Sequence, residues 1–147
     1  MRAERKPSSP GLPARRARPS LPLSTMDPGF PPALHDAFAR ADEVRIRPRG
    51  SSRRGVPIWV VVADGAVHIR SYKGRTAQWF ASATSAGTAE IEVDGQFLAV
   101  RLTAATSPAA IAAVSAAFLA KYRASPYAAA MVLPDVLDTT LRVTPAA

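Results

Sequence analysis

Cysteine is absent from the 147 residues of this sequence, which excludes disulfides, thiolate catalysis and zinc sites built on thiolates. Histidine occurs only at His35 and His68, and neither has a second ligand at metal-binding spacing, so we expect no metal. No apolar run approaches the ~20 residues that a membrane-spanning helix needs, so we expect no membrane association. A chain without cysteine is compatible with a reducing compartment, and we expect a cytoplasmic protein.

Complete catalytic motifs are also missing from the chain. The G-x-S-x-G motif of serine hydrolases does not occur, and the stretch 50–55 lacks the G-K-[ST] ending of a phosphate-binding P-loop. Glu90 and Glu92 share the outward face of a predicted strand, where they fit solubilising carboxylates better than a glycosidase pair. His68 could act as an acid or base, although a hydrogen-bonded strand histidine is the simpler interpretation. The sequence therefore identifies no catalytic residues and leaves open whether the protein is an enzyme.

Acidic residues are scarce relative to basic ones, with 11 against 19 and a net charge of +8. Most of the excess lies in residues 1–25, which carry six cations and one carboxylate and are rich in proline, arginine and serine. Such a segment buries too little apolar surface to fold, so we predict a disordered basic extension before a single domain at residues 26–147. Two alternatives stay open for the extension: a functional basic tail, or a translation start at Met26.

The predicted domain has a modest charge once the extension is set aside. Residues 26–147 carry a net charge of +3, so we do not expect nucleic acid as a partner. A nucleic-acid binder that uses the extension and the Arg45–Arg54 surface is the alternative, and it predicts steep salt dependence of binding.

Alternating and β-branched segments dominate the domain and predict a mainly β fold. The dipeptides Asp64-Gly65 and Asp94-Gly95 each separate two such segments and are typical of two-residue hairpin turns. Strand patterns occur at residues 44–47, 57–63, 66–71, 88–93, 96–103 and 139–143. The sequence therefore predicts an antiparallel sheet of six strands.

Helical patterns are few and short. They lie at residues 31–41, 76–82 and 107–123, and the last begins with the N-cap and proline pair Ser107-Pro108. The strand at Ile58–Ala63 is apolar on both faces, which is costly in an open sheet with one wet face. A closed barrel whose outer face is covered by a helix or by a second subunit resolves this cost. We therefore predict a small barrel that forms a homodimer.

A basic turn follows the first hairpin, over Arg70 to Arg75, and leads into the predicted helix at 76–82. Guanidinium groups bind phosphate with paired hydrogen bonds, lysine adds a point charge, and glycine permits close backbone approach. A hydroxyl-bearing basic turn before a helix N-terminus suits a phosphate or another anion. We predict an anion site at Arg70, Ser71, Lys73, Gly74 and Arg75, with a solvated turn as the alternative.

Two other groups of residues are candidates for ligand contacts. Trp59 and Trp79 could flank a planar ring, although aromatic residues at such spacings also serve as core. Arg45, Arg47 and Arg49 have the period-2 spacing of one strand face, and together with Arg53 and Arg54 they could form a second basic wall. The alternative is a solvated edge strand. We favour the edge strand for the set and keep Arg47 as a candidate contact.

These segments together resemble a family of small bacterial proteins of unknown function. That family is similar to the pyridoxamine-phosphate-oxidase-like split barrels and lies close to the deazaflavin-dependent nitroreductases. The resemblance covers about residues 42–145. It is carried by Pro57-Ile58-Trp59-Val60-Val61-Val62, Asp64-Gly65, Ile69-Arg70-Ser71, Gly74, Trp79, Ala120-Lys121-Tyr122, Met131-Val132 and Thr139 to Pro145.

The resemblance implies a mainly β (α+β) fold, a six-stranded antiparallel split β-barrel with a few short flanking helices. It also implies a homodimer with a flavin-type coenzyme in a groove near the subunit boundary, either FMN or an 8-hydroxy-5-deazaflavin. In such relatives the positions matching Arg70, Ser71, Lys73 and Gly74 help to hold the coenzyme phosphate, and the helix matching Trp79 lies nearby. We therefore expect a flavin- or deazaflavin-binding protein that is a small oxidoreductase, with a non-catalytic binder of an anionic small molecule as the alternative.

Overall fold

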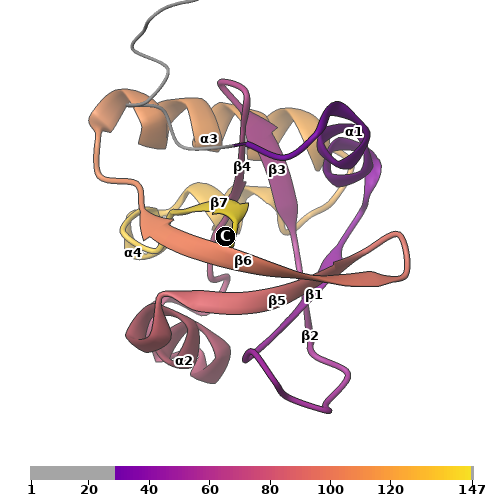
Figure 1. The fold of residues 1–147 in the computed structure, drawn as a ribbon. Helices are drawn as coiled ribbons and strands as arrows, with labels where there is room; N and C mark the ends of the chain where they lie inside the picture. The colour runs from indigo at the N-terminus through magenta and orange to yellow at the C-terminus, as the bar shows by residue number, and fades with distance from the viewer. Residues whose placement is uncertain (1–28, 147) are drawn as a thin grey trace, which may run out of the picture.

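The computed structural model describes residues 29–146, so the predicted extension at residues 1–25 lies outside the described part of the chain. Seven strands form one antiparallel sheet in the order β2-β1-β5-β6-β7-β4-β3, which curves into a nearly closed barrel (Figure 1). The strands are β1 (Val44–Arg47), β2 (Val56–Ile58), β3 (Val60–Ala63), β4 (Ala66–Ile69), β5 (Thr88–Val93), β6 (Gln96–Ala104) and β7 (Leu141–Pro145). The mainly β, antiparallel fold is thereby confirmed.

One predicted strand is two strands in the structure. The segment 57–63 divides at Trp59 into β2, which pairs with β1, and β3, which pairs with β4. β2 and β3 are therefore the two edges of the sheet, and the single residue Trp59 joins them. This corner brings the two edges together and raises the strand count from the predicted six to seven.

Helix α3 (Pro108–Lys121) covers the outer face of β3 and β4 (Figure 1). Val60 belongs to the core inside the barrel, whereas Val61 packs outside it with Val114 and Phe118 of α3. The strand is apolar on both faces because both faces are buried. The predicted helix-covered barrel is confirmed, and the homodimer stays a prediction.

Both hairpin turns have the backbone that the Asp-Gly dipeptide favours. Asp64 and Gly65 have φ values of 52° and 73°, and Asp94 and Gly95 have values of 52° and 76°. Positive φ at both central residues matches the right-handed twist of the flanking strands. The two hairpins, β3–β4 and β5–β6, lie where the sequence predicts them.

The remaining helices are short and flank the sheet (Figure 1). They are α1 (Pro32–Arg40), α2 (Gln78–Ala86) and α4 (Pro134–Leu137), with 3-10 turns η3 (Gly74–Thr76) and η4 (Ala128–Val132). The helix predicted at 76–82 begins at Gln78 because η3 occupies the preceding residues. Ser107 caps α3 as predicted, with its hydroxyl accepting the Ala110 N–H. Within the described residues, no helix has the length and apolarity needed to cross a membrane.

Candidate functional site

A cavity of about 520 Å³ opens at the corner between β2 and β3. Its walls come from β2, the turn after β4, the start of α2, and the η4 region. Four aromatic side chains line it: Trp59, Tyr72, Trp79 and Tyr127. The Tyr72 and Tyr127 side chains are 52% and 60% exposed, and their rings meet edge to face with centroids 6.2 Å apart. The cavity therefore has aromatic walls and an aromatic rim.

Three charged side chains line the same cavity, namely Glu43, Arg70 and Lys73. Lys73 and Glu43 are exposed, whereas Arg70 is buried with 1% of its surface accessible. Two cations against one carboxylate leave the cavity with a net positive lining, which favours an anionic ligand.

Arg70 is held by four neutral oxygen atoms. Its Nε donates to the Thr140 hydroxyl over 2.8 Å, and Nη1 donates to the Ser115 hydroxyl over 2.9 Å and the Met131 carbonyl over 2.8 Å. Nη2 donates to the Ile111 carbonyl over 2.9 Å. These bonds use four of the five N–H groups of a guanidinium, so the predicted paired grip on phosphate is not available to Arg70. Its side chain instead ties β4 to α3 and η4.

The charge on Arg70 is buried. Among residues 29–146, no carboxylate lies within ion-pair distance of its guanidinium. Burial lowers the pKa of Arg70 to about 10, so the group stays charged at neutral pH. A buried cation without a carboxylate partner attracts anions through the low-dielectric surroundings.

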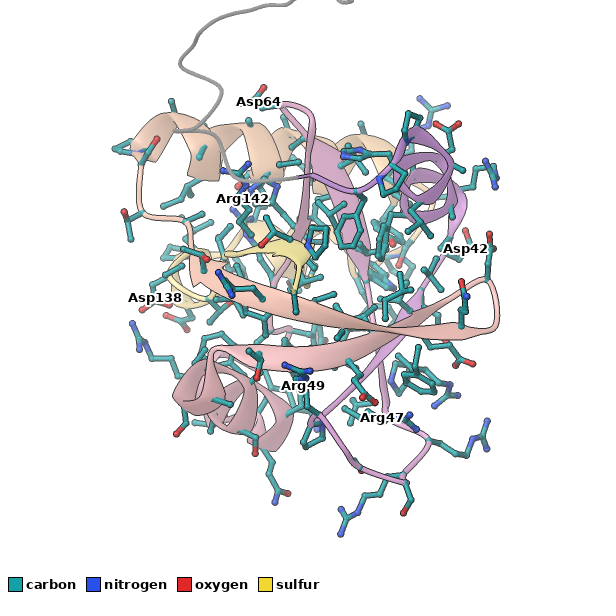
Figure 2. All side chains as sticks on the ribbon, viewed as in Figure 1. Asp42, Arg47, Arg49, Asp64, Asp138 and Arg142 are labelled. Atoms are coloured by element: carbon teal, nitrogen blue, oxygen red, sulfur yellow. The ribbon has the colours of Figure 1, made fainter. Side chains whose placement is uncertain are left out.

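Three members of the predicted anion site, Ser71, Gly74 and Arg75, do not line the cavity. The Ser71 hydroxyl donates to the Gly74 carbonyl over 2.6 Å, and both residues are buried. Gly74 has φ +71°, which glycine adopts at no steric cost. Arg75 is exposed and pairs with Asp138 over 2.8 Å at the α4 side of the molecule (Figure 2). The turn thus brings Arg70 and Lys73 to the cavity and leaves Arg75 outside it.

Both tryptophans predicted to flank a ring lie at this one cavity. Trp59 stacks on Tyr122 with centroids 3.9 Å apart and planes 2° apart. Trp79 meets Phe80 edge to face at 5.8 Å, and both tryptophans are partly exposed. Each indole therefore has a packed side and a part that is open to the cavity.

A second cavity of about 300 Å³ shares Val56, Gln78 and Trp79 with the first. Its basic lining comes from Arg47 and from Arg53 and Arg54 of the loop after β1. Trp79 therefore stands between an aromatic cavity and a basic one.

Arg47 braces the loop after β1. Its Nε lies 2.8 Å from a Glu90 carboxylate oxygen, and Nη1 donates to the Arg53 carbonyl over 2.8 Å. The guanidinium also lies over the Phe97 ring at 3.4 Å. The Arg47 pair lowers the pKa of Glu90. Arg47 is thus occupied by internal contacts, on the side of β5 that faces this loop (Figure 2).

The predicted solvated edge strand at Arg45, Arg47 and Arg49 is wrong. β1 lies between β2 and β5, because β2 supplies the pairing partner on its other side. Arg45 donates to the Gly55 carbonyl over 3.0 Å, so this side chain also fastens the loop.

His68 is a buried strand histidine on β4. Its Nδ1 lies 3.1 Å from the Ala66 carbonyl, and it does not line either of the two cavities described above. Burial lowers the pKa of His68 below 6.5, and the nearby charges of Arg142 and Arg70 act in the same direction. The simpler interpretation of His68, a hydrogen-bonded strand residue, agrees with this placement.

His68 is expected to make the fold sensitive to mild acid. Because its folded pKa lies below its unfolded value of 6.5, the unfolded chain binds a proton first as the pH falls. The free energy of unfolding is therefore highest above pH 6.5, where His68 is neutral in both states, and it decreases as the pH falls from 6.5 toward the folded pKa. Urea unfolding measured from about pH 7.5 to about pH 5 should show that the free energy of unfolding falls by less than about 1.4 kcal/mol per pH unit. In His68→Gln this dependence on pH should be weaker. Parallel curves for the two proteins would show that His68 is not the titrating group.

Several cavity residues carry no signal in the sequence. Tyr127 and Met131 follow α3 and reach the cavity only because η4 returns to the barrel. Tyr72 lies inside the predicted basic turn, and its position between the cations Arg70 and Lys73 is the one feature of the sequence that points to a ligand contact. Tyr122 does not line the cavity but stacks on Trp59, and this contact depends on the packing of α3, which local sequence does not show.

Comparisons with known proteins support the fold. The sequence profile of a family described as "Uncharacterized protein conserved in bacteria (DUF2255)" matches residues 35–143. A search of curated proteins finds no match. Among solved structures, the chain is similar to the conserved hypothetical protein Rv2991 from Mycobacterium tuberculosis, with 12% identity, a TM-score of 0.51 and 82% of each chain covered. At this identity the likeness concerns the fold alone.

Proposed function

We propose, for a chain that belongs to the DUF2255 family of bacterial proteins, a role as a flavin- or deazaflavin-binding protein of split-barrel type that acts as a small oxidoreductase. The observation that carries the proposal is the 520 Å³ cavity, which joins two tryptophans to Lys73 and the buried cation Arg70. Cavities of this size, mostly apolar with a few placed polar groups, are typical of coenzyme sites.

The residues present fit a phosphorylated ring compound. Trp59 and Trp79 offer aromatic surface for a planar ring, and aromatic pairs are stabilised by offset or edge-on contact. Lys73 is exposed at the cavity and can meet a phosphate as a point charge. Arg70 contributes the field of its buried positive charge, and the basic lining of the second cavity offers room for an anionic tail.

The bound coenzyme would supply the hydride transfer itself. The chain then has to bind the ring, orient it between aromatic walls and limit access of water. This division of labour agrees with the lining of the cavity, where the titratable groups are Glu43, Arg70, Lys73 and two tyrosines. Neither histidine lines this cavity.

The net positive lining of the cavity also fits a second candidate, a non-catalytic protein that binds an anionic small molecule. Thermal-shift measurements with coenzymes and simple phosphates separate the two, because stabilisation grows with ligand concentration over Kd. Stabilisation by phosphates alone would favour the non-catalytic candidate.

FMN and an 8-hydroxy-5-deazaflavin coenzyme are expected to bind with Kd values of about 1–10 μM, measured by fluorescence titration. Lys73→Met should weaken FMN about tenfold, because it removes the cation that faces the phosphate, and should leave riboflavin unchanged. Riboflavin has the same ring without the phosphate, so the difference isolates the charge contact.

Arg101→Met is the matched control, because it removes one positive charge as Lys73→Met does. Arg101 is exposed on β6 and does not line this cavity. The Arg101→Met change should leave both affinities unchanged. Failure of both coenzymes to bind at micromolar concentration would overturn the proposal.

A further inference from the structure

We infer that Tyr122 is a positioning residue that fixes the Trp59 indole as a rigid stacking wall for the ring of the ligand. The inference rests on the proposed function for the identity of that ring, but the rigidity of Trp59 is a property of the protein alone. Among the anionic small molecules considered above, a rigid stacking wall favours those that contain a planar aromatic ring.

The stack between the two rings is close and parallel. Their centroids are 3.9 Å apart and their planes differ by 2°. Because Tyr122 covers one face of the indole, Trp59 can offer only its opposite face and its edges to the cavity that it lines. A planar ligand that stacks on Trp59 would thus extend an existing aromatic stack by one layer.

The Tyr122 hydroxyl anchors the stack to the corner of the barrel. It accepts the Val60 N–H over 3.2 Å and donates to the Asp42 carbonyl over 2.7 Å. Burial raises the pKa of Tyr122 to about 12, so the hydroxyl keeps its proton at neutral pH. The hydroxyl therefore holds the backbone immediately after Trp59, at the point where β2 ends and β3 begins.

Lys121, the residue before Tyr122, also binds the backbone of Val60. Its Nζ donates to the Val60 carbonyl over 2.7 Å and to the Phe38 carbonyl over 3.1 Å. Both backbone polar groups of Val60 are thus bound by the end of α3. A wall fixed in this way loses little conformational entropy when a ring stacks on it, which raises affinity without adding a contact.

Tyr122→Phe tests the inference, because it keeps the ring and removes the hydroxyl. In ligand-free protein that carries Trp79→Phe, so that Trp59 is the sole tryptophan, Tyr122→Phe should lower the fluorescence anisotropy of Trp59. In the chain with both tryptophans, the same change should raise the Kd of FMN about fivefold. Circular dichroism checks that each variant is folded, and a role in stability alone would lower the melting temperature without changing the anisotropy.

Tyr127→Phe is the matched control, an exposed tyrosine at the same cavity that does not stack on Trp59, and should leave the anisotropy unchanged. If Tyr122→Phe does not fold, Lys121→Met releases the Val60 carbonyl and should lower the anisotropy by a smaller amount. Unchanged anisotropy in the folded variant overturns the inference, as does unchanged FMN affinity. If the unsubstituted protein binds neither FMN nor the deazaflavin coenzyme, the proposed function is overturned instead, while the anisotropy still decides whether Tyr122 holds Trp59.

Discussion

Replacing Arg70 with methionine is expected to lower the free energy of unfolding by about 3 kcal/mol. The change leaves the Thr140 and Ser115 hydroxyls and the Met131 and Ile111 carbonyls without this donor. Thr140 and Met131 are buried, whereas Ser115 and Ile111 are half-buried. Relief from burying a charge offsets part of this loss. Urea unfolding measures the difference, and the melting temperature should fall by about 10 °C.

Arg75→Met is the control for this prediction, because it removes an arginine five residues later on the same turn. Arg75 is exposed and its bond to Asp138 is a surface ion pair, so the expected loss is below about 1 kcal/mol. Arg70→Lys should behave more like Arg70→Met than like the natural chain, since an ammonium group cannot reach four acceptors set around a planar guanidinium. Equal stability of Arg70→Met and Arg75→Met would refute the bracing role of Arg70.

Phe118→Ala is expected to cost about 4 kcal/mol of unfolding free energy. Phe118 is completely buried between α3 and the outer face of the barrel, where it packs with Val61 and lies 6.1 Å from the Tyr122 ring. The smaller side chain leaves a cavity in this layer and removes the ring that faces the Arg70 guanidinium at 5.6 Å. Equilibrium denaturation measures the loss.

Leu119 provides a control on the same helix, since it is the next residue and is 44% exposed. Leu119→Ala should change stability by about 0.5 kcal/mol or less. A large loss for Leu119→Ala with a small one for Phe118→Ala would mean that α3 packs on the barrel with its other face.

Local sequence patterns were sufficient for most of the fold. The two Asp-Gly turns, the alternation of β5 and the Ser107-Pro108 start of α3 depend on neighbouring residues, and each lies where it was predicted. The break at Trp59 could not be seen, because β2 and β3 read as one apolar run and divide only when they pair with different strands. The place of β1 inside the sheet was missed for the same reason.

The candidate site was predictable in its location more than in the role of each side chain. The turn after β4 and both tryptophans do meet at one cavity. The sequence could not show that Arg70 points under α3 and bonds to residues 41 to 70 positions away, since those partners come together only through packing. Lys73 and Arg75 differ by two positions, yet one lines the cavity and the other binds Asp138.

The joint at Trp59 has a consequence for how copies of this protein meet one another. A sheet with long unpaired edge strands can pair with strands of other molecules and form polymers. Here the two edges are the short strands β2 and β3, tethered to each other through one residue. β2 also contains Pro57, which lacks the N–H that an incoming strand would need. The corner at Trp59, which shapes the cavity, therefore also leaves little edge backbone available for amyloid-like pairing between molecules.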